Sequence, residues 1–146
     1  MALPAVNWIA VIGATIATMV IGAIWYSPDV FGKKWMKLAM RNMPKDKKSV
    51  AAAKEKMQQG MMKGYALTFL TTLLTAYVLA LFVGMTQAIT FGEGVMIGFW
   101  IWLGFVATNI FGGYIWEKDP IDLFLLKAGY NLVIFAVMGG ILAVWV

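Results

Sequence analysis

Trp25-Tyr26-Ser27-Pro28-Asp29-Val30-Phe31-Gly32-Lys33-Lys34-Trp35 marks the point where the chain changes character. The sequence before this stretch is apolar and uncharged, and a strongly basic region follows it. Such a change is typical of a membrane boundary, because Lys and Arg collect in the cytoplasmic loops that flank hydrophobic spans. The other parts of the chain can be placed relative to this boundary.

The composition favours an integral membrane protein. Of the 146 residues, 62% are hydrophobic and only 13% are charged, whereas soluble domains carry about 25% charged residues. A soluble fold of this length has too much surface to hide so many apolar side chains. The chain also has no Cys and no His. Disulfides, thiolate metal sites and the commonest general base are therefore excluded.

Four long apolar stretches predict an all-α polytopic membrane protein with four transmembrane helices in a single domain, residues 1–146. About 20 helical residues cross the ~30 Å hydrocarbon core. The first stretch has 21 uncharged residues. We expect it to be retained, since no Lys or Arg precedes it as in a signal peptide. The predicted spans are residues 6–26, 64–84, 94–116 and 123–145.

Residues 28–63 are expected to form an amphipathic helical hairpin in the membrane interface, between the first and second spans. Ser27-Pro28-Asp29 has the pattern of a helix start, and Pro44 would end this first helix. The second helix would begin at Ser49. It either runs straight into the second span or bends at Gly60 or Gly64. Expected interface contacts, aromatic and basic, are Trp25, Tyr26, Phe31, Lys33, Lys34, Trp35, Lys37 and Arg41.

The basic residues also predict the orientation of the chain. Ten of the twelve Lys and Arg residues lie between Lys33 and Lys63. The two others, Lys118 and Lys127, lie in or beside the loop between the third and fourth spans. By the positive-inside rule both termini face outside and the basic loop is cytoplasmic. A nucleic-acid partner is not expected, because a basic loop in such a protein reports orientation.

Polar residues within the spans have two interpretations. The simpler one is that they mark the faces on which the helices pack, with Thr bonding to its own helix and Asn bonding across helices. The other is that they line a small polar cavity for a substrate or an ion. No carboxylate lies deep in a span, which disfavours a proton relay. The possible intramembrane site is Asn7, Thr68, Thr72, Thr75, Trp102, Asn109, Lys127, Tyr130 and Asn131.

Acidic residues cluster only at Glu117, Asp119 and Asp122. Three carboxylates could supply some ligands of a hard cation, but a solvated loop that pairs with Lys118 or Lys127 is the simpler interpretation. No metal, no cofactor and no catalytic residues are predicted. Ser27 and Ser49 have no His partner, and no Gly-rich phosphate loop is present, so an enzyme is not expected.

Several motifs of this chain recur together in one known family: Asn7-Trp8, Gly22 to Pro28 with Phe31-Gly32-Lys33 and Trp35, Lys127-Ala128-Gly129-Tyr130, and Met138-Gly139 with Trp145. On these motifs the sequence resembles the bacterial domain of unknown function (DUF) 1761 family of small four-span membrane proteins. It covers nearly the whole chain, and the Trp-Tyr-Ser-Pro block is its specific part. It implies a four-span bacterial membrane protein, which we expect in the inner membrane, and it implies no activity.

Three hypotheses for function remain open. The first is a binding, assembly or accessory protein that oligomerises, or joins a larger complex, and engages anionic lipid or a partner through the basic hairpin. The second is a homo-oligomeric channel or transporter subunit for small solutes or ions, with the Thr residues and Asn109 and Asn131 along its path. The third, a membrane enzyme, is disfavoured by the missing His, Cys and deep acids.

Overall fold

The computed structural model describes residues 3–42 and 46–145, and every regular element in these ranges is a helix. Four helical segments are long and apolar enough to cross a membrane, with α4, η1 and α5 forming one of them. The all-α membrane fold is thereby confirmed. The elements are α1 (Trp8–Trp25), α2 (Gly32–Ala39), α3 (Lys47–Thr86), α4 (Phe91–Ile101), the π-helix η1 (Trp102–Ala107), α5 (Thr108–Trp116) and α6 (Ile121–Val144).

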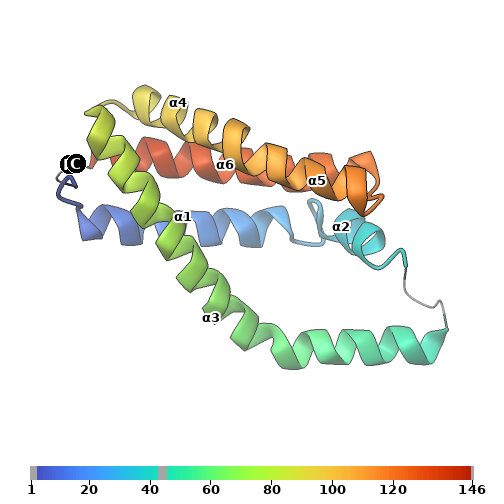
Figure 1. Ribbon diagram of the computed structural model, residues 1–146. Coiled ribbons are helices and arrows are strands. Elements are labelled where there is room, and N and C mark those ends of the chain that lie inside the picture. The colour runs from blue at the N-terminus through green and yellow to red at the C-terminus, as the bar shows by residue number, and fades with distance from the viewer. Residues whose placement is uncertain (1–2, 43–45, 146) are drawn as a thin grey trace.

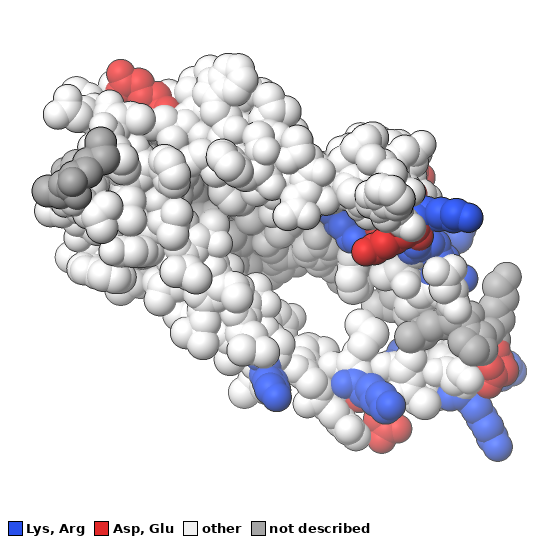
Figure 2. Space-filling view, in the orientation of Figure 1, with Lys and Arg blue, Asp and Glu red and all other residues white. Residues whose placement is uncertain are grey.

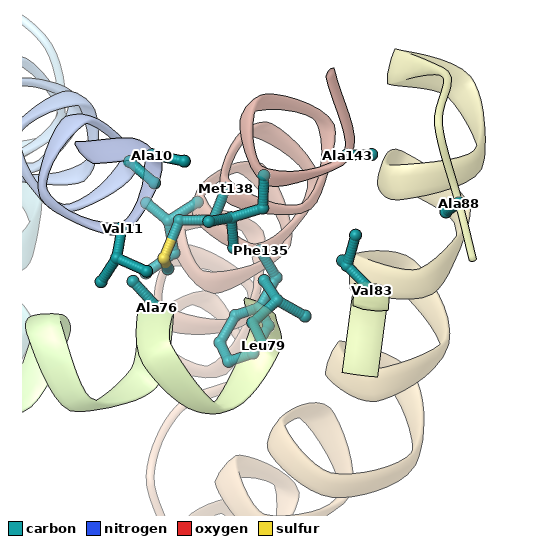
Figure 3. Packing of buried hydrophobic residues seen from close by; sticks show 12 residues of the cluster. Ala10, Val11, Ala76, Leu79, Val83, Ala88, Phe135, Met138 and Ala143 are labelled. Atoms are coloured by element: carbon teal, nitrogen blue, oxygen red, sulfur yellow. The ribbon is translucent and has the colours of Figure 1, made fainter. Parts of the chain in front are cut away.

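Helix α6 packs against α1, α3 and α4 and holds the bundle together (Figure 1). Figure 3 shows Val11 of α1, Leu79 of α3 and Met138 of α6 pointing toward one another, and all three side chains are almost completely buried. Both termini lie at the same end of the bundle (Figure 1). There the Asn7 amide donates a hydrogen bond of 2.7 Å to the backbone carbonyl of Trp145.

Helices α4 and α6 approach each other more closely than side chains would allow. A Cβ atom at Gly98 would lie 2.1 Å from the Phe135 carbonyl oxygen, and one at Gly94 would lie 2.0 Å from that of Gly139. Glycine is therefore required on both helices. Close approach of this kind replaces hydrophobic burial as the attraction between helices in lipid.

The third span does not present the face that regular helical spacing predicts. Gly98 is buried and Trp102 is half-buried, but Phe105, Asn109 and Trp116 are exposed. The reason is η1, because a π-helical turn holds an extra residue and rotates everything that follows it. Within η1 the inward positions include Val106 and Ala107.

The second predicted span, 64–84, is only part of α3, a continuous helix of 40 residues. At 1.5 Å per residue α3 is ~60 Å long, about twice the thickness of the hydrocarbon core. Asp46 caps its start by accepting a hydrogen bond from the Ser49 amide, which holds the pKa of this carboxyl below its usual value. The helix changes direction within its green part (Figure 1). The open alternative is thus resolved as one helix that bends.

The region expected as a hairpin, 28–63, differs in detail from the prediction. Residues 27–31 form a turn, and α2 begins at Gly32 with no side-chain cap, so Ser27 does not start a helix. Helix α2 ends at Ala39, and Pro44 lies outside the described residues. The first part of α3 runs roughly parallel to α1 and α6 instead of across the end of the bundle (Figure 1). Its place in a membrane interface stays a prediction.

Candidate functional site

The Trp-Tyr-Ser-Pro turn gathers aromatic rings at the end of the bundle opposite the termini. The ring centroids of Trp25 and Phe31 are 4.8 Å apart, those of Tyr26 and Trp35 are 5.7 Å apart, and those of Tyr26 and Tyr130 are 5.1 Å apart. Tyr130 belongs to α6, so the cluster joins α1, α2 and α6. Edge-to-face and tilted aromatic pairs at these distances stabilise such a junction.

The Ser27 carbonyl oxygen accepts two backbone hydrogen bonds within this turn. The Val30 amide nitrogen lies 3.2 Å from this oxygen, and the Gly32 amide nitrogen lies 2.8 Å from it. A Cβ atom at Gly32 would lie 2.3 Å from the Tyr26 carbonyl oxygen, so only glycine fits there. The indole N–H of Trp25 is buried, and it has no acceptor within the described part of the chain. An unpaired buried donor is costly, which sets this turn apart from ordinary packing.

Asp119 forms the electrostatic centre of this end of the molecule. Its carboxylate accepts from Arg41 Nη2 at 2.5 Å and from Lys127 Nζ at 3.3 Å, and the residue is only 8% exposed. Burial raises its pKa, but the hydrogen bonds and charges of Arg41 and Lys127 outweigh burial and hold the pKa below its usual value. The expected pairing of the acidic loop with Lys127 is therefore present, and Arg41 joins it from the segment after α2.

The basic residues of α2 are only partly available to outside groups. Lys34 forms an ion pair of 3.3 Å with Asp122, in which both side chains are about half exposed. Lys33 and Lys37 are exposed. A second exposed basic surface is carried by residues 47–63 of α3, here called the basic arm, and includes Lys47, Lys48, Lys54, Lys56 and Lys63. Figure 2 shows Lys and Arg gathered toward this end of the molecule, away from the termini.

The acidic residues do not converge on a common point. Asp119 and Asp122 each face a cation, and Glu117 is exposed. Among the described residues, no three His, Cys, Asp or Glu side chains lie close enough together to hold a metal ion. At the opposite end, the Glu93 carboxylate accepts from the Thr90 amide and caps α4, as its place at the helix start predicts.

The polar residues expected to form an intramembrane site are scattered. Trp102 donates to the Ala128 carbonyl across helices at 2.9 Å, and Asn131 bonds back to the Lys127 carbonyl at 2.8 Å. Thr68 and Thr75 bond to carbonyls of their own helix, at Gly64 and Thr71. Thr72 is half-buried, while Asn109 is exposed and Asn7 lies at the far end. Within a single copy of the chain, these residues do not line one path, and a path between protomers stays a prediction.

Two members of that set, Thr68 and Tyr130, do share a cavity of about 340 Å³, with Tyr26 and Tyr65. It lies where α3 diverges from α1 and α6. Sequence reasoning assigned Tyr26 to the lipid interface and left Tyr65 out of the candidate site. The available signal was the stripe of Tyr65, Thr68 and Thr72 on α3, which continues toward the buried Ala76 at helical spacing.

Residues 9–143 match the family described as "Protein of unknown function (DUF1761)", so the chain belongs to that family. No curated protein matches the chain. No solved structure matches it either.

Proposed function

For this member of the DUF1761 family, we propose a non-catalytic binding and assembly role in the bacterial inner membrane. Its basic arm, residues 47–63 of α3, would engage anionic lipid at the cytoplasmic surface. The observation that carries the proposal is that five lysines of the arm are exposed on a helix that extends well beyond the length of a span. Each Lys near an anionic surface adds about 1 kcal/mol.

The apolar side of the arm supports the same role. Met57 and Met61 are 44% and 47% exposed, and they share a helix face with Val50 and Ala53. A helix that carries such a stripe beside lysines binds the headgroup layer by burying the stripe and pairing its cations with phosphates. Nothing lies within 4 Å of the Cβ positions of Gly60 and Gly64. The arm therefore has room to change its angle and settle on the membrane surface.

The test uses the full-length protein, extracted gently with its own lipids and examined by native mass spectrometry. We expect the wild type to retain anionic lipid several-fold over zwitterionic lipid. A variant with all five arm lysines changed to Gln should lose this preference, whereas the matched Lys→Arg variant should keep it. If the Gln variant retains anionic lipid as well as the wild type, the arm is not the lipid-binding surface. If a second polypeptide is bound to the wild type and lost from the Gln variant, the arm binds a protein partner and not lipid.

Self-association is the second candidate, in a scaffold or as a homo-oligomeric channel or transporter subunit. It is favoured by the large apolar side chains of α3 that the rest of the chain leaves uncovered, among them Leu67, Leu70 and Leu74, each more than half exposed. The same mass spectra decide it. An integer multiple of the 16.1 kDa chain would support it, and a monomer that passes no solute in liposomes would exclude it.

A further inference from the structure

The cavity between α1, α3 and α6 is lined by uncharged residues and has the size of a small-molecule site. It is lined by Met19, Gly22, Ala23, Tyr26, Tyr65, Thr68 and Tyr130. Its volume of about 340 Å³ falls within the ~300–1,000 Å³ range of small-molecule sites. Figure 2 shows an opening between α3 and the rest of the chain. The cavity is thus large enough for a headgroup and too small for lipid chains.

Three phenol hydroxyls are available to this cavity. Within the described residues, no side-chain hydrogen bond joins the hydroxyls of Tyr26, Tyr65 or Tyr130 to another group of the chain, and Tyr26 and Tyr130 are half-buried. None of these hydroxyl oxygens is fully enclosed by the chain. Each hydroxyl therefore remains accessible and can donate a hydrogen bond to a ligand.

Gly22 keeps space open beside one of these hydroxyls. A Cβ atom at residue 22 would lie 2.9 Å from the Tyr130 hydroxyl oxygen. Tyr26 packs edge-on against the Tyr130 ring, with centroids 5.1 Å apart, which fixes the two phenols relative to each other. The pair therefore offers two donors in a set geometry, one directly after the end of α1 and one in the middle of α6.

The lining residues also indicate what the cavity excludes. None of them is charged, so a phosphate or carboxylate would enter without a counter-ion, at high cost. The Thr68 hydroxyl already donates to the Gly64 carbonyl at 2.8 Å. What remains is a set of neutral donors beside aromatic rings, which suits a neutral acceptor such as a carbonyl oxygen.

We propose that this cavity binds the carbonyl-bearing headgroup of an uncharged, amphipathic membrane molecule, held by the hydroxyls of Tyr26 and Tyr130. Two sources supply this chemistry, the ring of an isoprenoid quinone and the ester group of a diacylglycerol. The apolar tail would leave the cavity past Ala23 and Tyr65, which line it and are both exposed. The site needs no lysine, so it stands independently of the basic arm.

The test begins with full-length protein in phosphatidylcholine nanodiscs. A short-tailed isoprenoid 1,4-benzoquinone and a short-chain diacylglycerol are added separately, and binding is measured by native mass spectrometry. We expect one molecule of one probe to bind per chain. The double variant Tyr26→Phe/Tyr130→Phe keeps both rings and removes both hydroxyls, and it should bind about tenfold more weakly. Gly22→Val fills the space beside Tyr130 and should abolish binding.

Two control variants separate this site from a general effect on the bundle. Tyr77→Phe removes the hydroxyl of a tyrosine outside the cavity, whose ring stacks on Trp8. Gly112→Ala adds a Cβ atom at a position where nothing lies within 4 Å. Both should bind like the wild type. Binding of the quinone alone or of the ester alone identifies the source. The proposal is overturned if neither probe binds the wild type, or if the double Phe variant binds as tightly as the wild type.

Discussion

The two ends of the bundle are built on different principles. At the end that carries the termini, α1, the last part of α3, α4 and α6 share a continuous apolar core with Val11, Leu79, Val83, Met138 and Leu142. At the other end α3 leaves its neighbours, and this end of the molecule carries a tyrosine-lined cavity, an aromatic turn and a buried carboxylate. Close packing of apolar side chains holds the first end together, whereas aromatic contacts and ion pairs hold the other.

Glycine shows the same contrast on a smaller scale. Gly94, Gly98 and Gly139 sit where another helix backbone touches them, while Gly60 and Gly64 face open space. The first group determines how closely two helices meet, and the second gives a long helix freedom to bend. The difference predicts that stability is concentrated toward the end that carries the termini. Four substitutions test this division.

The largest effect is expected from Gly98→Ala. Its Cβ would lie 2.1 Å from the Phe135 carbonyl oxygen, so α4 and α6 must separate along their whole contact. We expect the free energy of unfolding to fall by about 3 kcal/mol, measured by denaturant titration in mixed micelles with circular dichroism. Gly112→Ala, in the same span but with an open Cβ position, should change stability little. Equal effects of the two variants would contradict a special role for the close contact.

This contact could be predicted only in part from the sequence. The apolar stretches determine the number of spans. Regular helical spacing would put Asn109 on the same side of the third span as Trp102. A π-helical turn depends on the balance of packing over several helices. The residue types in Trp102–Ala107 do not by themselves indicate such a turn. Asn109 was therefore placed inward and is exposed.

The charged end was harder still to predict. Asp119 lies between Lys118 and Pro120 in a short loop, and such a sequence is typical of a solvated turn. Its burial depends on Arg41, which is 78 positions away in the chain. The cavity likewise depends on the direction in which α3 diverges. Local patterns determine the spans, whereas both features of the candidate site come from contacts between distant segments.

The second-largest effect is expected from Asp119→Asn, which leaves Arg41 and Lys127 close together without their shared anion. We expect a loss of about 2 kcal/mol, as for hydrogen bonds to charged groups. Because the pKa of Asp119 is lowered in the folded state, this stabilisation is complete above about pH 4, the ordinary Asp value. It is lost as the pH falls through the lower folded-state pKa. Unfolding titrations at several pH values measure both effects.

The matched control for this carboxylate is Glu117→Gln in the same loop, where the side chain is exposed. It should leave both the stability and its dependence on pH nearly unchanged. If Glu117→Gln and Asp119→Asn behave alike, the loop contributes only net charge, and the assignment of Asp119 as the centre of this end is wrong.

A third substitution, Asn7→Ala, tests the terminal end without touching its apolar core. The Asn7 side chain accepts from the amides of Ile9 and Ala10 and donates to the Trp145 carbonyl. Loss of a helix cap costs about 1 kcal/mol. Asn7→Asp keeps the acceptor that caps α1 and removes the donor to Trp145, so comparison of the two variants by thermal unfolding separates the two contributions. A neutral Asn7→Ala variant would contradict the cap.

The smallest effect is expected from Lys34→Gln, and it bears most directly on how the charged end works. The Lys34–Asp122 pair has the same 3.3 Å separation as the Lys127–Asp119 pair, but both of its side chains are 53% exposed. Water screens such a pair, so its loss should cost less than about 0.5 kcal/mol. Arg41→Gln removes a partner of the buried Asp119 and should cost clearly more in the same unfolding titration. If the two losses are equal, burial of Asp119 contributes nothing, and the open end is held by its aromatic rings alone.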